Sequence, residues 1–141
     1  MIADLTALQE IRSAWNGVEA LGEQIQVGLF ASVGIIGGVY PFSVADAAHN
    51  LPFLHPYAVL NDTLEQLASE DKFICKSIFL GKLLQESEQV LPWNDFAVIK
   101  SGAGRRHDLT HRGDVLPRDD CWKYIDAIKT ELTLWGILIA S

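Results

Sequence analysis

The segment with the clearest periodicity is DDCWKYIDAIKTELTLWGILI, residues 119–139. Its apolar positions recur at alternating spacings of four and three residues: Cys121, Ile125, Ile128, Leu132, Trp135 and Ile139. Polar residues occupy the opposite side: Lys123, Asp126, Lys129 and Thr133. One apolar seam along a helix is typical of antiparallel bundles and coiled coils. The segment therefore predicts an amphipathic helix that packs lengthwise against other helices.

A similar seam lies near the N-terminus and predicts a second long helix. Its apolar and small residues are again three or four apart: Leu8, Ile11, Trp15, Val18, Gly22, Ile25 and Leu29. We expect this helix to begin at about Ala3 and to end near Gly37 and Gly38, ahead of Pro41.

The middle of the chain predicts the remaining helices, which we place at 43–50, 57–68, 72–89 and from Pro92 to Gly113. Pro52 and Pro56 predict an irregular connector at 51–56, because closely spaced prolines disfavour helix. The segment 69–71 resembles a helix break. The broad apolar distribution in 72–89 predicts a central helix. Gly102 and Gly104 weaken the last of these helices or allow a neighbour to approach closely.

No alternating strand pattern of useful length is present. The chain is therefore expected to be all-α, a single domain (1–141) forming an up-and-down four-helix bundle with one additional short helix. With 141 residues it is long enough to bury a core.

Cysteine content and the N-terminus favour a cytoplasmic protein. Only Cys75 and Cys121 are present, too few for a disulfide framework, and both are expected to be core thiols. Acidic residues early in the chain do not fit a signal peptide. The apolar run 27–42 is shorter than the roughly twenty residues of a membrane-spanning helix, and we expect a buried helix end and no membrane partner.

The charge distribution isolates one basic region in an acidic chain. The net charge is −7, which disfavours broad nonspecific binding to nucleic acid. From Lys100 to Lys123, however, six basic residues outnumber four acidic ones. A local basic patch of this kind suits a short phosphate-bearing segment better than a long duplex.

The centre of this region is Arg105-Arg106-His107-Asp108-Leu109-Thr110-His111-Arg112-Gly113. Arginine presents a planar charged fork to phosphate oxygens, and histidine exchanges protons near neutral pH. His107 and His111 are about 40° apart around an ideal helix, but Arg106 and His111 are about 140° apart. Convergence of that pair requires an unwound last turn, the reach of arginine, or a second copy of the segment.

Three interpretations of this stretch remain open. The arginines clamp an RNA phosphodiester while His111 acts as general acid or base, without a metal because the 2′-hydroxyl is an internal nucleophile. Alternatively, the same residues bind phosphate or an acidic partner without chemistry. Finally, Arg–Asp and His–Asp pairs simply stabilise a helix C-terminus.

No metal or cofactor is expected. His107, Asp108, His111 and Asp114 lack a clear fourth ligand and the metallopeptidase pattern. His49 and His55 are expected to be surface or loop histidines.

The motif Arg106-His107-Asp108-Leu109-Thr110-His111 resembles the Arg–polar–x–x–x–His signature of the HEPN superfamily (higher eukaryotes and prokaryotes nucleotide-binding domain). The proline-bearing turn and final helix are also similar to that family, so that the resemblance covers roughly residues 57–139. It implies an all-α domain that dimerises and brings two motifs into a basic cleft. Many members are metal-independent endoribonucleases of toxin–antitoxin or defence systems, and some pair with a nucleotidyltransferase antitoxin.

Carried over to this chain, the resemblance implies that Arg106 holds the scissile phosphate, His111 exchanges the proton and His107 occupies the polar position. Arg105 and Arg112 match no fixed family position and are phosphate- or RNA-binding candidates from local charge alone. Two departures are present. The polar residue is His107 where Asn is usual, and Gly113 replaces the Tyr of the subgroup regulated by nucleotide addition. Some family members do not cleave RNA, so a non-catalytic module that binds nucleotide, RNA or a partner is the alternative.

Overall fold

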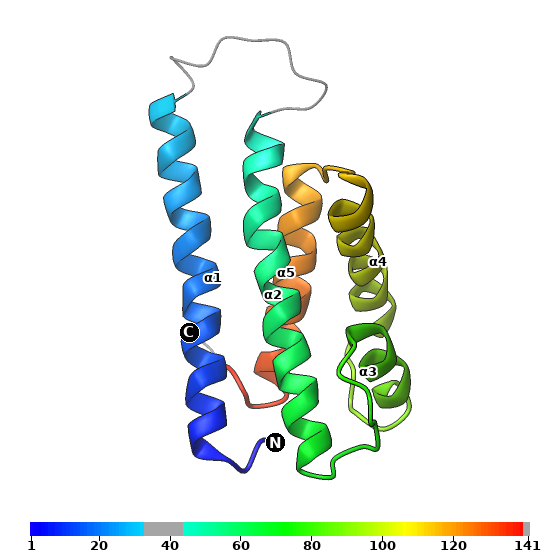
Figure 1. Ribbon diagram of the computed structural model, residues 1–141. Helices are drawn as coiled ribbons and strands as arrows, with labels where there is room; N and C mark the ends of the chain where they lie inside the picture. The colour runs from blue at the N-terminus through cyan, green and yellow to red at the C-terminus, as the bar shows by residue number, and fades with distance from the viewer. Residues whose placement is uncertain (33–43, 140–141) are drawn as a thin grey trace.

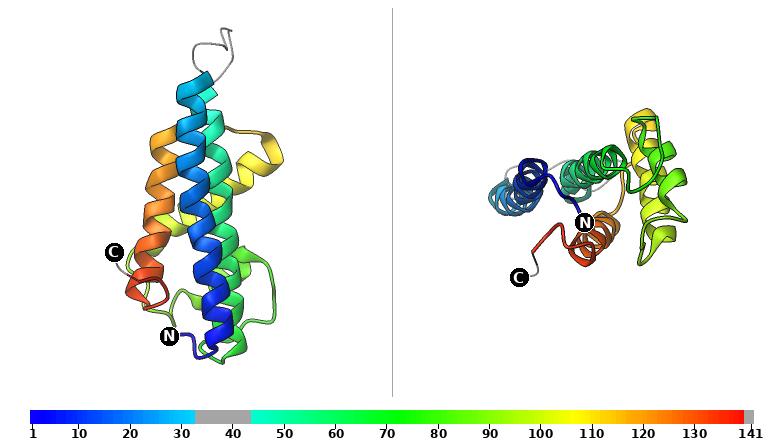
Figure 2. Two further views of the ribbon diagram at one scale, coloured as in Figure 1. Left: turned by 90° about the vertical axis from the view of Figure 1, so that its left-hand side faces the viewer. Right: turned by 90° about the horizontal axis from the view of Figure 1, so that it is seen from below.

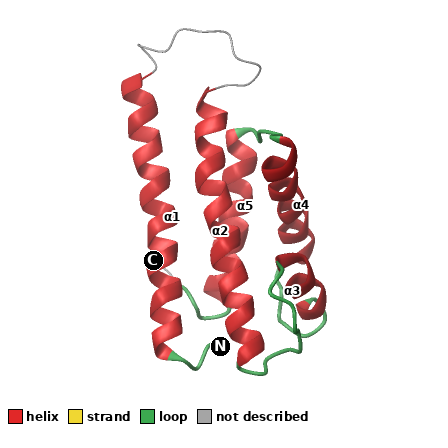
Figure 3. Ribbon diagram, viewed as in Figure 1, coloured by secondary structure: helices red, strands yellow, loops and turns green. Residues whose placement is uncertain are grey.

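A computed structural model describes residues 1–32 and 44–139, and this part of the chain contains five helices and no strand (Figures 1 and 3). Four are long and one is short: α1 (Leu5–Ser32), α2 (Val44–Ser69), α3 (Leu80–Ser87), α4 (Phe96–Arg112) and α5 (Arg118–Leu134). The all-α prediction, with four main helices and one short one, is confirmed. None of the described helices is long and apolar enough to cross a membrane.

Helix α2 is the centre of the fold. It packs against α1, α3, α4 and α5, and the end-on view in Figure 2 shows α1 on one side and the α3–α4 pair on the other. The prediction that residues 72–89 form the central helix is therefore wrong. The inward residues of α2 are fully or almost fully buried: Phe53, Tyr57, Val59, Leu60, Leu64 and Leu67.

The seam of α5 is confirmed over most of its length. Cys121, Ile125, Ile128, Leu132 and Trp135 are buried in the core. Ile139, in contrast, is 76% exposed, because the helix ends at Leu134 and Gly136 turns the backbone with a φ of 74°. Ile137 and Leu138 are buried in its place.

The seam of α1 is confirmed where its side chains are described. Ile11, Trp15 and Val18 are buried, and the Asp4 carboxylate accepts the backbone N–H groups of Thr6 and Ala7 at 3.0 and 3.2 Å. Such a side-chain cap explains why the helix begins at Leu5. The expected end near Gly37–Gly38, most of the run 27–42, and the seam side chains Ile25 and Leu29 lie outside the described residues.

The predicted connector at 51–56 is wrong, because α2 continues through Pro52 and Pro56. Consequently the predicted short helix at 43–50 and the helix at 57–68 are parts of one element, and the short helix of the fold is α3. Each proline removes one helical N–H, a cost of about 3 kcal/mol or more. Both prolines are buried, and the long apolar face around them offsets this cost.

Near the first of these prolines, the buried Asn50 fixes α2 to the start of α5. Its amide donates to the carbonyl of Leu116 at 2.9 Å and its oxygen accepts the Leu116 N–H at the same distance. The Asp46 carboxylate accepts the Arg118 N–H at 2.8 Å. These bonds hold the turn after α4 against α2.

His49 also corrects an expectation, since it is buried and not on the surface. Trp122 Nε1 donates to His49 Nδ1 at 3.1 Å, and the two rings meet edge to face. Burial lowers the pKa of His49, and the charge of Arg118 acts in the same direction, opposed by Asp46. His55 is exposed, as expected, but lies on α2.

Residues 72–79 do not form the predicted helix, although the break at 69–71 is confirmed. Asp71 adopts a positive φ of 59°, and the chain remains non-helical until α3. Phe73 alone in this stretch is buried, while Ile74, Ile78 and Phe79 are 85%, 67% and 74% exposed. Cys75 is only half-buried, so the core-thiol expectation is confirmed for Cys121 alone.

Helix α4 begins four residues later than predicted, at Phe96. The Asp95 side chain accepts the Val98 N–H at 3.3 Å, and the buried Glu131 carboxylate accepts the N–H groups of Asn94 and Asp95 at 2.6 and 2.9 Å. Pro92 therefore lies in the preceding loop. The predicted stop at Gly113 is confirmed, with a φ of 70° and its N–H bonded to Leu109 O at 3.0 Å.

Candidate functional site

Arg106 lies on the side of α4 that faces the core. Two buried residues earlier in the helix lie on the same side. Ile99 and Gly102 precede Arg106 by seven and four positions and are buried. A Cβ at Gly102 would collide with the Tyr57 hydroxyl and lie 2.6 Å from the Tyr124 ring. Gly102 therefore lets α4 approach α2 and α5 closely. Gly104 has open space instead.

Arg106 is a half-buried residue, and its Nε is buried without a hydrogen-bond partner among the described residues. Burial raises the pKa of Tyr57 well above its ordinary value and Tyr124 adds to this, whereas the positive charge of Arg106 opposes it. Arg106 therefore holds a buried N–H donor that is unpaired among the described residues. An anionic oxygen would satisfy it.

A cavity of about 650 Å³ lies between α3 and α4 beside Arg106. Its walls combine apolar, basic, amide and acidic groups: Leu80, Gly81, Leu84, Gln85, Glu88, Phe96, Lys100, Ala103, Gly104, Arg106 and His107. Arg106 also borders a second cavity of about 340 Å³ toward α2, which Leu80, Asn61 and Asp62 help to line. Arg106 thus separates two solvent-reachable spaces.

The two histidines of the motif lie together on the outer side of α4. The rings of His107 and His111 are 4.3 Å apart at 38°, and both residues are exposed. His107 also lines the α3–α4 cavity with Arg106. His107 therefore links the phosphate-binding candidate to the proton-transfer candidate.

The remaining two arginines face elsewhere. Arg105 forms an ion pair with Asp120 on α5 at 3.6 Å, and Arg112 is exposed in the last turn of α4. Their spacing of seven residues puts them about 20° apart on the helix. They lie on a side of α4 distinct from the His107–His111 side.

The last turn of α4 does not unwind. It remains helical through Arg112, and the Gly113 and Asp114 N–H groups cap it by bonding to Leu109 O and Asp108 O. Arg106 and His111 consequently stay on sides of the helix that are about 140° apart. Arg106 lines the α3–α4 cavity and the neighbouring cavity toward α2, and His111 lines neither of these two.

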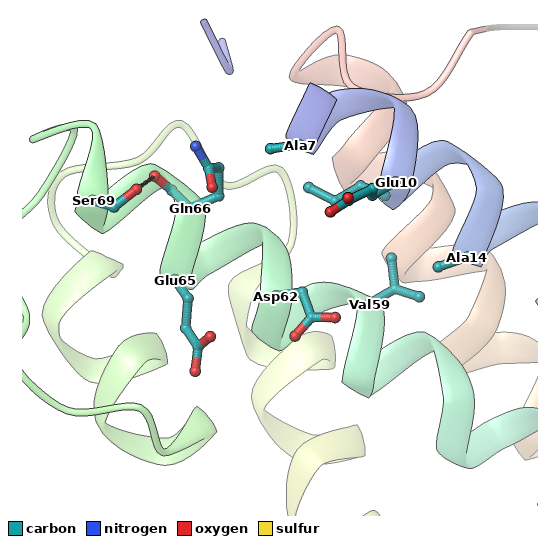
Figure 4. A pocket seen from close by; sticks show the side chains of 9 residues that line it. Ala7, Glu10, Ala14, Val59, Asp62, Glu65, Gln66 and Ser69 are labelled. Atoms are coloured by element: carbon teal, nitrogen blue, oxygen red, sulfur yellow. Dashed lines mark hydrogen bonds between the residues drawn. The ribbon is translucent and has the colours of Figure 1, made fainter. Parts of the chain in front are cut away.

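A third cavity, of about 420 Å³, lies between α1 and α2 (Figure 4). Among the described residues, its polar lining includes the carboxylates of Glu10, Asp62 and Glu65 and no basic side chain. Such a groove would repel phosphate. The basic motif and this acidic groove therefore suit different ligands.

The structure also adds residues that sequence reasoning missed. Leu84, Gln85 and Glu88 line the α3 side of the cavity that Arg106 and His107 also line. The signal available was the Leu80-Leu83-Leu84 spacing, which marks one apolar side of α3 with Gln85 and Glu88 beside it. In the described ranges, no three His, Cys, Asp or Glu residues come together in a way that could hold a metal ion.

Comparisons with protein-family models, curated proteins and solved structures give no significant match. The functional interpretation accordingly depends on the residues of the motif and on their surroundings in the fold.

Proposed function

We propose that this chain is a HEPN-like, metal-independent endoribonuclease of the toxin or defence type. The observation that carries the proposal is the position of Arg106 beside a cavity that His107 also lines, with its buried Nε unpaired among the described residues. His107 in turn contacts His111 through its ring. This gives an anion-binding group and two titratable groups on one helix.

In the proposed reaction, His111 removes the proton of the RNA 2′-hydroxyl, and the resulting oxygen attacks the adjacent phosphorus. Arg106 stabilises the negative charge that develops on the phosphoryl oxygens. The P–O5′ bond breaks, and the leaving oxygen takes a proton from a titratable group such as His107. The products are a 2′,3′-cyclic phosphate and a free 5′-hydroxyl.

The proposal includes a homodimer with the two motifs facing each other. The capped, straight end of α4 keeps Arg106 and His111 of one chain on different sides. A second copy related by a two-fold axis would let the Arg106 of one subunit act with the His111 of its partner. Arg112, exposed in the last turn of α4, would supply positive charge to RNA that extends beyond the cleft, whereas Arg105 is paired with Asp120.

The test is cleavage of RNA by the full-length protein in the presence of EDTA, compared with Arg106→Ala and His111→Ala. We expect both variants to lose most activity, with cyclic-phosphate ends on the wild-type products. Arg118→Ala and His55→Ala are matched controls, since both side chains are exposed and outside the motif. Absence of cleavage, or equal cleavage by all variants, would overturn the proposal.

A non-catalytic module is the second candidate, and the separation of Arg106 from His111 favours it. In that case the chain binds nucleotide, RNA or an acidic partner through Arg106 without turnover. Binding that Arg106→Ala abolishes, in a protein that leaves RNA intact, would identify this function.

A further inference from the structure

The α3–α4 cavity has a composition that the phosphate chemistry alone does not explain. One end carries Arg106 and His107, but the lining also includes Phe96, Gln85 and Glu88. The Glu88 carboxylate accepts hydrogen bonds and would not bind a phosphate. It suits a second group on the ligand, one that donates hydrogen bonds.

The two ends of the cavity are well separated. Leu80, at the start of α3, lies at the Arg106 end, because both residues also line the neighbouring cavity toward α2. The end of α3 lies near the start of α4, since Trp93 Nε1 donates to Ser87 O at 3.3 Å and the Trp93 ring packs on Phe96. The ten helical steps from Phe96 to Arg106 span about 15 Å. Glu88 and Phe96 thus mark the end of the cavity distant from the arginine.

Phe96 provides a fixed aromatic wall at that end. Its ring meets Trp93 edge to face at 5.2 Å, and Trp93 meets Trp135 at 4.7 Å. The Trp135 Nε1 donates to Pro92 O at 3.4 Å. Aromatic side chains held in this manner are the usual surfaces on which single-stranded bases stack.

We propose that this cavity is a nucleobase subsite that accepts bases bearing an exocyclic amino group. The inference depends on the proposed function, because the phosphate of the same nucleotide would bind Arg106. The base would pack on Phe96, and its amino group would donate to the Glu88 carboxylate, with Gln85 pairing to the base edge. Adenine, cytosine and guanine carry such a group and uracil does not. A volume of about 650 Å³ is in the range of small-ligand sites.

The test measures binding of the four nucleoside 3′,5′-bisphosphates to the full-length protein by calorimetry. These probes carry a phosphate on both sides of the sugar, so either chain direction is sampled. We expect the adenosine, cytidine and guanosine compounds to bind at least about fivefold more tightly than the uridine compound.

Two variants and one control make the test specific. Glu88→Gln should reduce this preference to about twofold or less, because its amide can donate to the uracil O4. Phe96→Leu should weaken the binding of all four compounds. Glu86→Gln should behave as wild type, since Glu86 pairs with Lys82 at 3.1 Å and does not line this cavity.

Equal binding of the four compounds, no binding, or an unchanged preference in Glu88→Gln would overturn the subsite. These failures differ from failure of the proposed function. RNA cleavage that requires Arg106 and His111, together with equal binding of the four bases, would contradict only the proposed subsite. Base discrimination without any RNA cleavage removes only the ribonuclease.

Discussion

The buried carboxylate of Glu131 accepts the backbone N–H of Asn94 at 2.6 Å and so ties α5 to the start of α4. A second bond, from the Asp95 N–H at 2.9 Å, lies beside it. Since Asp95 is the N-cap of α4, this carboxylate positions the helix that carries the Arg/His motif.

Glu131 should make stability depend on pH. Burial raises its pKa, opposed by the N–H groups of Asp95 and Asn94, so the folded protein binds a proton more tightly than the unfolded chain. The stabilisation by protonated Glu131 is therefore fully present below the ordinary glutamate pKa. It is lost as pH rises through the raised pKa of the folded protein. Urea unfolding at several pH values should show the free energy of unfolding falling as pH rises over this range. Glu131→Gln should abolish this part of the pH dependence. The same pH dependence of stability in wild type and Glu131→Gln would contradict the role given to Glu131.

His49 should give the opposite pH dependence of stability. Its pKa is lowered by burial, so protonation favours the unfolded chain and stability falls as pH drops below the ordinary histidine value of about 6.5. His49 Nδ1 accepts from Trp122, which requires the neutral ring. Thermal unfolding of the wild type and His49→Gln between neutral and mildly acidic pH tests this. His55→Gln, exposed on the same helix, is the control that should retain the wild-type dependence.

Two glycines of α4 should respond oppositely to alanine. Gly102→Ala places a methyl group against the Tyr57 hydroxyl and Tyr124 ring, and overpacking of this kind costs about 1–3 kcal/mol. Gly104→Ala meets open space and should gain up to about 1 kcal/mol from helix propensity. Chemical denaturation of the two variants measures the difference. A stabilised Gly102→Ala would mean that α4 can move away from α2 and α5.

The two thiols should differ in reactivity. Burial raises the pKa of Cys121 to about 12, so this thiol should remain unmodified in the folded protein. Cys75 is only half-buried in the segment before α3. Titration with a thiol reagent should therefore modify one cysteine in native buffer and two in denaturant. Modification of Cys121 in native buffer, identified by peptide mass, would contradict its burial.

The seams of α1 and α5 and the stop at Gly113 could be predicted because their signals are local. A periodic repeat of apolar residues directly indicates which side of a helix is buried. A glycine after a helix indicates a left-handed turn that ends it. The path of the chain at Pro52 and Pro56 could not be predicted in this way. The cost of the two prolines is offset by the packing of α2 on the four other described helices, which a short window of sequence does not contain.

The candidate site divides along the same line. Residue types and spacing identified Arg106, His107 and His111, and the structure places His107 beside each of the other two. The inward position of Arg106 depends on Gly102, whose contacts are Tyr57 on α2 and Tyr124 on α5. The α3 wall of the cavity depends on where the non-helical stretch 72–79 ends. Both are tertiary properties.

The central position of α2 has a consequence for how the molecule comes apart. Every other helix in the described chain packs on it, so none can detach without exposing part of its apolar face to water. Such an arrangement favours all-or-none unfolding over the stepwise loss of separate units. The amides that open only with the whole molecule should then cluster in the second half of α2, beyond Pro56, whereas those of the eight-residue α3 should open earlier.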